Sequence, residues 1–175
     1  MFIYKYLTFI ACPTQRRSLW CVIMKQSELL RFFHKDLFIP ALQASDKDGV
    51  LKELAGYLES EDKLYETSLV YDLLKRREDL GSTGIGGGIA IPHCRSIAVR
   101  KLTVLCALKP QGVDFKAADA QPVKLFFLVV APPHDINYLV FLGKLVELVT
   151  GKKINKALFN ITSFEDFKNL ISGVK

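Results

Sequence analysis

The sequence predicts a single α/β domain in which a small mixed β-sheet is sandwiched between helical layers. Two runs, residues 102–108 (LTVLCAL) and 123–130 (VKLFFLVV), are typical of strands and are too apolar for a sheet with one wet face. Segments with helical periodicity precede, separate and follow the strands. At 175 residues the chain has room for one core of ordinary size.

Two helices are predicted before residue 81. A short apolar segment, residues 29–38, leads to Pro40 and is expected to form a turn of helix followed by an extended stretch. Residues 45–48 (SDKD) offer side-chain acceptors for the free amides of a helix start, and apolar residues then recur at three and four up to Leu58. A second helix is expected from Leu64 to about Lys75, followed by basic residues and Gly81.

Three more helices are predicted after the second apolar strand. Shorter helices are expected at residues 152–159 and 163–172, and the last opens with Ser163 and Asp166 in a capping pattern. Turn residues are expected to close the two strands at 109–112 (KPQG) and 131–133 (APP). The first of the three helices runs from residue 135 to about 149, and its apolar side is expected to contain Leu139, Leu142, Leu145, Val146 and Val149.

Composition and charge argue against two classes of partner. The net charge is +6, but three of these charges lie in residues 1–23, and the basic residues that follow mostly alternate with acids. We therefore expect no nucleic-acid partner. No apolar run reaches the roughly 18 residues of a membrane-spanning helix, so no direct membrane insertion is expected either.

The four cysteines are Cys12, Cys21, Cys94 and Cys106, and none forms a CxxC pair. Neither a disulfide framework nor a metal site is predicted from this spacing. Reduced thiols of this kind favour a cytoplasmic location.

Residues 1–23 differ from the rest of the chain because they are apolar, aromatic and free of acids. We interpret them as an N-terminal extension, either a leader or the product of a start assigned too early, with Met24 as the true initiator. The folded domain is expected to comprise residues 24–175.

The segment 81–93, GSTGIGGGIAIPH, contains five of the eleven glycines within eight residues. Neither G-x-x-x-x-G-K-[ST] nor G-x-G-x-x-G fits it, so no nucleotide or other cofactor is predicted. Pro92 is expected to end a short strand and to present His93 at its edge. A neutral imidazole so presented is a candidate nucleophile for phosphorus, although a turn-rich hairpin with an incidental surface histidine explains the composition equally well.

If His93 does attack phosphorus, its neighbours offer groups that bind phosphoryl oxygens. The candidates are the Arg77 guanidinium, the hydroxyl of Ser82 or Thr83, and a phosphate-cradling loop of backbone amides. That loop is the segment 84–88, and its glycines are Gly84, Gly86, Gly87 and Gly88.

The exact order of residues 76–95, RREDLGSTGIGGGIAIPHCR, resembles the signature of phosphotransferase-system enzyme IIA domains of the fructose/mannitol type. Sixteen consecutive positions, Arg77 to Pro92, fit that signature and lead to the histidine that the family phosphorylates. A second stretch, residues 112–125, is similar to the family's P-I-x-F-x-A-x-D-x-Q-P-V pattern. The likeness extends over about residue 24 to the C-terminus.

The resemblance implies a phosphohistidine carrier. His93 is expected to accept a phosphoryl group on its distal nitrogen from HPr or the nitrogen-branch homologue of HPr, with Arg77 and Thr83 assisting. The residues of the signature are most similar to those of the nitrogen-regulatory branch. Members of that branch bind target proteins in a way that depends on their own phosphorylation state. The alternative is a sugar-specific enzyme IIA that passes the group to a cysteine of an enzyme IIB. Whether the chain counts as an enzyme stays open.

Two positions depart from the family pattern. Gly87 stands where the family often has asparagine, and Tyr138 stands where the family has a second histidine beside the phosphorylated ring. A phenol can donate a hydrogen bond, but it does not take up a proton near neutral pH. His134, four residues earlier, is a candidate substitute. Cys94 is expected to point away from His93, because neighbours in an extended chain face opposite sides.

Overall fold

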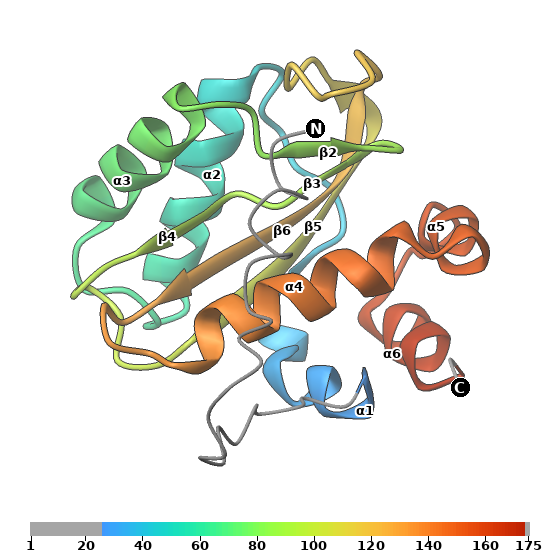
Figure 1. The fold of residues 1–175 in the computed structure, drawn as a ribbon. Coiled ribbons are helices and arrows are strands. Elements are labelled where there is room, and N and C mark those ends of the chain that lie inside the picture. Colours follow the sequence, from blue (N-terminus) through green and yellow to red (C-terminus); the bar gives the residue numbers. More distant parts are fainter. Residues whose placement is uncertain (1–25, 174–175) are drawn as a thin grey trace, which may run out of the picture.

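The structure, a computed structural model, describes residues 26–173 (Figure 1). The proposed extension, residues 1–23, lies outside the described residues, so the expected domain boundary at residue 24 stays a prediction. Two single 3₁₀ turns, Leu30–Phe32 and Lys35–Leu37, follow the first helix. The helices are α1 (Gln26–Leu29), α2 (Lys47–Ser60), α3 (Thr67–Asp79), α4 (Asn137–Thr150), α5 (Lys152–Leu158) and α6 (Phe164–Ser172). The strands are β1 (Phe38–Ile39), β2 (Gly84–Gly86), β3 (Ile89–Ala90), β4 (His93–Arg95), β5 (Thr103–Val113) and β6 (Val123–Ala131).

The strands form one mixed sheet in the order β1-β5-β6-β3-β2, with β4 also paired to β6. Antiparallel pairing of β5 with β6 makes the centre of the sheet, in a register that places Leu105 opposite Leu128. The shorter strands β3 and β4 both run parallel to β6, and β1 runs parallel to β5. The two apolar runs of the sequence are thus the central strands, as predicted.

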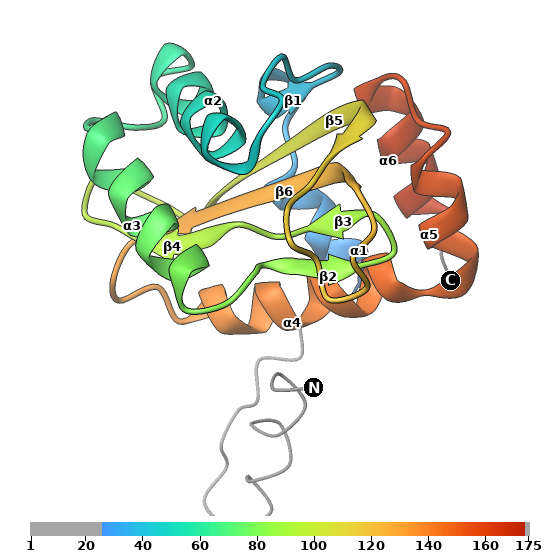
Figure 2. The same ribbon diagram turned by 90° about the horizontal axis from the view of Figure 1, so that it is seen from above.

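Alternate residues of β6 enter two separate hydrophobic clusters. Phe127 and Val129 pack into the cluster under α1, α4, α5 and α6, whereas Phe126 and Leu128 pack into the cluster under α2 and α3. Figures 1 and 2 show these two helical layers on opposite faces of the sheet. The predicted arrangement of a sheet between helical layers is confirmed, and it explains why neither central strand shows the alternation of a half-wet sheet.

Three details differ from the sequence-based expectation. Strand β5 continues through the predicted turn to Val113, because a register shift after Leu108 accommodates Pro110 and lets Val113 rejoin β6 opposite Val123. Helix α3 spans Thr67–Asp79 rather than starting at Leu64. Leu139, expected on the apolar side of α4, is 68% exposed, because α4 turns Tyr138, Phe141 and Leu145 toward the sheet instead.

The break at Ile91 and Pro92 divides two strands that share one neighbour. Ala90 lies opposite Phe126 and His93 lies opposite Val129, so the register on β6 continues across the break. The strand before Pro92 does end, as expected, but His93 begins β4 rather than following the last strand residue. Since β4 has only β6 as a partner among the described strands, His93 stands at an edge of the sheet. In residues 26–173, no helix combines the length and apolar character needed to cross a membrane.

The predicted capping pattern of the last helix is present and provides a stability test. The Ser163 hydroxyl accepts a hydrogen bond from the Asp166 amide, and the Asp166 carboxylate accepts one from the Ser163 amide. Ser163→Ala is expected to lower the free energy of unfolding by about 1 kcal/mol, measured by urea denaturation. Ser172→Ala, which removes a hydroxyl from the end of the same helix, serves as control. Equal effects of the two substitutions would contradict the capping role.

Candidate functional site around His93

His93, Arg77 and Tyr138 come from three elements that meet at the edge of the sheet. His93 opens β4, Arg77 lies in the last turn of α3, and Tyr138 lies in the first turn of α4. The Arg77 Nε atom is 3.1 Å from His93 Nε2, and the rings of His93 and Tyr138 have centroids 6.3 Å apart. The structure therefore brings together three residues that are far apart in the sequence and that the sequence had singled out.

Two hydrogen bonds fix the protonation of the His93 ring. Nδ1 lies 2.6 Å from the carbonyl oxygen of Ile91, and that oxygen can only accept a hydrogen bond. Nδ1 therefore carries the proton. At the other side of the ring, the Arg77 Nε–H can only donate, so Nε2 must be the unprotonated acceptor. The distal nitrogen, Nε2, is the nucleophilic atom of this imidazole.

Burial lowers the pKa of His93 below its ordinary value of 6.5. The hydrogen bond to Ile91 opposes this shift, the positive charge of Arg77 adds to it, and the negative charge of Glu78 opposes it. The net shift lowers the pKa and so favours the neutral form of the His93 ring. At neutral pH His93 is thus available as a nucleophile without prior loss of a proton.

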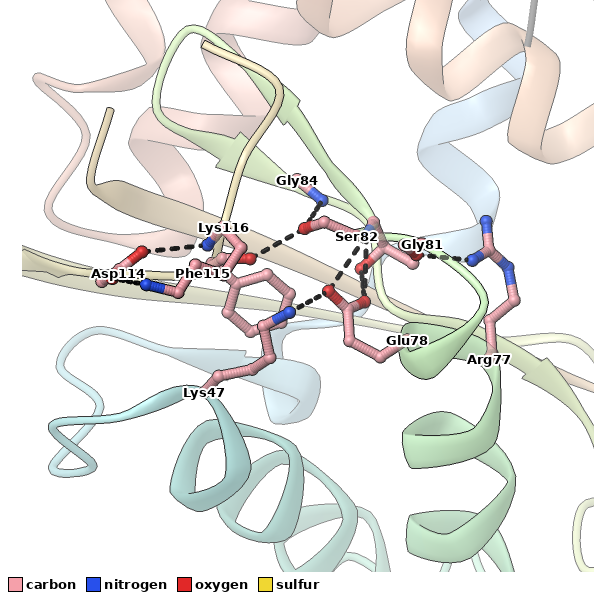
Figure 3. Close-up of polar contacts among 10 residues, drawn as sticks. Lys47, Arg77, Glu78, Gly81, Ser82, Gly84, Asp114, Phe115 and Lys116 are labelled. Atoms are coloured by element: carbon pink, nitrogen blue, oxygen red, sulfur yellow. Dashed lines mark hydrogen bonds and ion pairs between the residues drawn. The ribbon is translucent and has the colours of Figure 1, made fainter. Parts of the chain in front are cut away.

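Arg77 is held in place by a second hydrogen bond. Its Nη1 donates to the carbonyl oxygen of Gly81 at 2.9 Å, which ties the guanidinium to the segment after α3 (Figure 3). Arg77 still has N–H groups for which the structure gives no partner beyond His93 and Gly81. A guanidinium anchored in this way beside Nε2 can bind the oxygens of a phosphoryl group on that atom.

Tyr138 lies beside His93, where the resemblance implies a second histidine. It is buried, and burial raises the pKa of its phenol to about 12. The guanidinium carbon of Arg95 sits 4.8 Å from the centroid of the Tyr138 ring. This neighbour thus stays a neutral packing group across the physiological pH range. A base at this position is not available.

Thr83, an expected ligand of the phosphoryl group, has both of its donors directed elsewhere. Its amide and its hydroxyl donate to the carboxylate of Glu78, the hydroxyl over 2.6 Å. Lys47 Nζ donates to the same carboxylate at 2.8 Å and lies over the ring of Phe115. Thr83 thus has a structural contact here, and its contact with a phosphoryl group stays a prediction. Glu78 belongs to the matched signature, but the sequence pattern predicted no role for Glu78 or Lys47.

The expected phosphate-cradling loop is not assembled at His93. Gly86, Gly87 and Gly88 have positive φ. Gly86 ends β2, Gly87 and Gly88 form the turn to β3, and the Gly87 amide donates to Asp119. Ile89 pairs with Leu125 and His93 with Val129, a separation along β6 of roughly 13 Å. Gly84 lies nearer, opposite Ala90, but its amide donates to the Ser82 hydroxyl (Figure 3). Gly87 and Gly88 thus allow a tight turn. Gly84 allows the backbone to pass close to Ala117, since a Cβ at Gly84 would lie 2.8 Å from Ala117.

Other candidate groups lie apart from this site. His134 is exposed in the segment before α4, and the structure gives it no contact with His93. Cys94 packs into the cluster under α2 and α3, and burial raises the pKa of its thiol to about 12. The thiol of Cys106 is also buried, which likewise raises its pKa. Over residues 26–173, no three His, Cys, Asp or Glu side chains are grouped so that they could hold a metal ion.

The chain is similar to proteins of one phosphorylation system. Residues 31–174 match the family model described as "Phosphoenolpyruvate-dependent sugar phosphotransferase system, EIIA 2". A nitrogen regulatory protein of Bradyrhizobium diazoefficiens is 34% identical over 124 residues, which cover 70% of this chain and 80% of that protein. The fructose-specific EIIABC component of Bacillus subtilis is 30% identical over 150 residues, which cover 85% of this chain but 23% of that longer protein.

Solved structures show the same likeness. The nitrogen regulatory protein IIA-Ntr of Neisseria meningitidis matches with a TM-score of 0.74 and 30% identity, over 81% of this chain and 97% of that one. Enzyme IIAMTL of Escherichia coli, solved in a complex with phosphorylated enzyme IIBMTL, matches in fold with a TM-score of 0.68 at 19% identity, over 81% and 98% of the two chains.

The chain belongs to the EIIA 2 family of the phosphoenolpyruvate-dependent sugar phosphotransferase system. Its relatives include both nitrogen regulatory proteins and fructose-specific components. The predicted resemblance, the fold class and the predicted class of function, a component of this system, are confirmed.

The surroundings of His93 predict its titration. Its midpoint, followed by NMR of the ring C–H signals, is expected below 6.5, and Arg77→Gln should raise it because the guanidinium disfavours the imidazolium. The unfolded ring binds a proton more readily than the folded one. Its contribution to stability is therefore complete above about pH 6.5 and is lost as the pH falls toward the folded pKa. A wild-type midpoint above 6.5 would contradict the deduced environment.

Proposed function

We propose that His93 is the phosphoryl acceptor of this chain and that Nε2 forms the bond to phosphorus. The observation that carries the proposal is the pair of hydrogen bonds that leaves Nε2 unprotonated and beside Arg77. An unprotonated ring nitrogen with an adjacent guanidinium provides the two groups that phosphoryl transfer needs, a nucleophile for in-line attack and a cation for the phosphoryl oxygens.

The transfer step balances without a cofactor. The Nε2 lone pair attacks phosphorus of a donor phosphohistidine, the donor N–P bond breaks, and the donor imidazole leaves with its electron pair. Attack places positive charge on the His93 ring, which the Ile91 carbonyl stabilises through Nδ1–H. Because Arg77 Nε–H now points at the attacking lone pair, the guanidinium has to shift and hydrogen-bond the phosphoryl oxygens instead.

The partner that supplies the phosphoryl group is, in this proposal, HPr or its nitrogen-branch homologue. Exposed apolar side chains lie on the elements that carry the site: Leu80 follows Arg77 at the end of α3, and Ile136 and Leu139 flank Tyr138. Exposed apolar groups next to a reactive residue support docking of a protein rather than of a small solute. We place this relay in the cytoplasm, and the free, buried thiols of Cys94 and Cys106 support that location.

Downstream, we propose a regulatory switch of the nitrogen-regulatory type, in which phosphorylation of His93 changes the binding of target proteins. The identity to nitrogen regulatory proteins supports this role. A phosphoryl group adds about two negative charges beside the exposed apolar residues, which is sufficient to change a binding surface. The alternative is transfer to an enzyme IIB, which the fructose-specific relatives and the complex formed by Escherichia coli IIAMTL favour.

The acceptor is tested by labelling. Phosphoenolpyruvate, the first enzyme of the relay and HPr are expected to label the wild-type chain but not His93→Ala. Arg77→Ala should remain folded and be labelled roughly 10- to 100-fold more slowly, a loss of about 1.4 to 2.7 kcal/mol of transition-state stabilisation. Arg76→Ala, which removes the exposed neighbouring arginine, is the matched control at saturating donor. A labelled His93→Ala chain would remove the assignment.

The two downstream roles are separated with the labelled chain. Under the regulatory proposal, the phosphoryl group is expected to stay on His93 when purified enzyme IIB domains of the fructose and mannitol type are added. The phosphorylated and unphosphorylated chains should then retain different proteins in a pull-down assay. Rapid transfer of the label to a IIB cysteine would instead establish the sugar-specific alternative.

A further inference from the structure

Glu78 is the only buried carboxylate or cationic group among the side chains that the structure describes. It is 6% exposed, lies in the last turn of α3, and directly follows Arg77 in the sequence. Three donors converge on it: the Thr83 amide, the Thr83 hydroxyl and Lys47 Nζ. Figure 3 shows the Lys47 side chain reaching the Glu78 carboxylate. Lys47 is the first residue of α2, so this carboxylate joins α2, α3 and the segment that leads into β2.

Glu78 is connected with both hydrogen-bond partners of the His93 ring, with Arg77 directly along the chain and with Ile91 through Thr83. On the Nε2 side, the donor is Arg77, the neighbour of Glu78 on the same helical turn. On the Nδ1 side, the acceptor is the Ile91 carbonyl, and the Ile91 amide donates to the Thr83 carbonyl oxygen at 3.0 Å. Thr83 in turn is held to Glu78 through its amide and its hydroxyl.

We propose that Glu78 is the positioning residue of the phosphoryl site. By fixing the end of α3 and Thr83 to one carboxylate, it sets Arg77 and Ile91 at the two nitrogens of His93 and so determines which nitrogen carries the proton and which one can react. This inference rests on the proposed function of His93 and extends it to a residue that does not touch the ring. Lys47 supplies the positive charge that makes burial of the carboxylate tolerable.

A role in stability alone does not account for this arrangement. A buried ion pair can frequently be replaced by apolar residues with no loss of stability. The reason is that the free energy needed to remove two charges from water is about as large as the free energy gained from their attraction. Hydrogen bonds to a charged acceptor, however, are strongly directional and fix the groups that donate them. Errors of about 1 Å in the placement of catalytic groups reduce rates by up to about 100-fold, so directional fixing matters most next to a reacting atom.

Glu78→Gln is the substitution that tests the proposal with the least change in shape. Glutamine offers one oxygen to three donors and turns an NH₂ group toward them, so at least one of these donors loses its partner. Asp79→Asn is the matched control, because it removes the exposed carboxylate next along the same helix. Urea denaturation first identifies conditions in which both variants are folded.

Two readouts separate positioning from stability in the folded variants. The first is labelling by phosphorylated HPr, where Glu78→Gln is expected to lower the maximum rate roughly 10- to 100-fold and leave the KM for the donor within about twofold. The second is the ¹⁵N chemical shifts of the His93 ring, which should report a mixture of tautomers in Glu78→Gln. Wild type and Asp79→Asn should show one tautomer, protonated at Nδ1.

A folded Glu78→Gln chain with the wild-type labelling rate and a single tautomer would overturn the proposal. If Glu78→Gln does not fold, Thr83→Val removes the hydroxyl donor alone, and it is expected to slow labelling about 3- to 10-fold. An unchanged rate in Thr83→Val would then overturn the proposal as well. The tautomer measurement needs no phosphoryl donor, so it tests Glu78 even if the wild-type chain is not labelled and the proposed function itself fails.

Discussion

The hydrogen bond between His93 Nδ1 and the carbonyl oxygen of Ile91 fixes the protonation of the ring on which the proposed function depends. A carbonyl oxygen has no proton to give, so Nδ1 holds the proton and Nε2 keeps its lone pair. Partial burial, together with the positive charge of Arg77, lowers the pKa of the ring and keeps it neutral at physiological pH. Nucleophilic character thus arises from backbone geometry two residues away from the histidine.

The fold supplies that geometry through a strand broken at a proline. Pro92 has no amide proton for the sheet, and the Ile91 amide is directed to Thr83 rather than to β6. The register on β6 nevertheless continues, so His93 is held at the sheet edge by the central strand. From there the ring meets α3 on one side and α4 on the other, and each helix contributes one neighbour, Arg77 and Tyr138.

The sequence predicted the parts of this structure that depend on local pattern. Apolar runs, helical periodicity and the Ser163 cap located the sheet and the helices, and the signature identified Arg77 and His93. The remaining features depend on contacts between distant segments. Only the folded chain shows that Glu78 is buried and that Thr83 donates hydrogen bonds to it. The same holds for the Gly87 amide, which donates to Asp119 instead of to a phosphoryl group.

Leu139 and the glycines illustrate two different limits of sequence reasoning. The periodicity of α4 fits more than one apolar face, and the sheet selects the one that contains Tyr138 and Phe141, so Leu139 faces solvent. A glycine-rich segment, for its part, is compatible with an anion site and with a tight turn. Positive φ at three successive glycines and the register of β3 on β6 place the turn away from His93.

Coupling between ¹⁵N and ³¹P in the phosphorylated chain shows whether Nε2 of His93 is the reacting atom. Histidine labelled at both ring nitrogens assigns the phosphorus to one of them. We expect coupling to Nε2 and none to Nδ1, with Nδ1 still hydrogen-bonded to Ile91. Coupling to Nδ1, or a phosphoryl group on any residue other than His93, would contradict it.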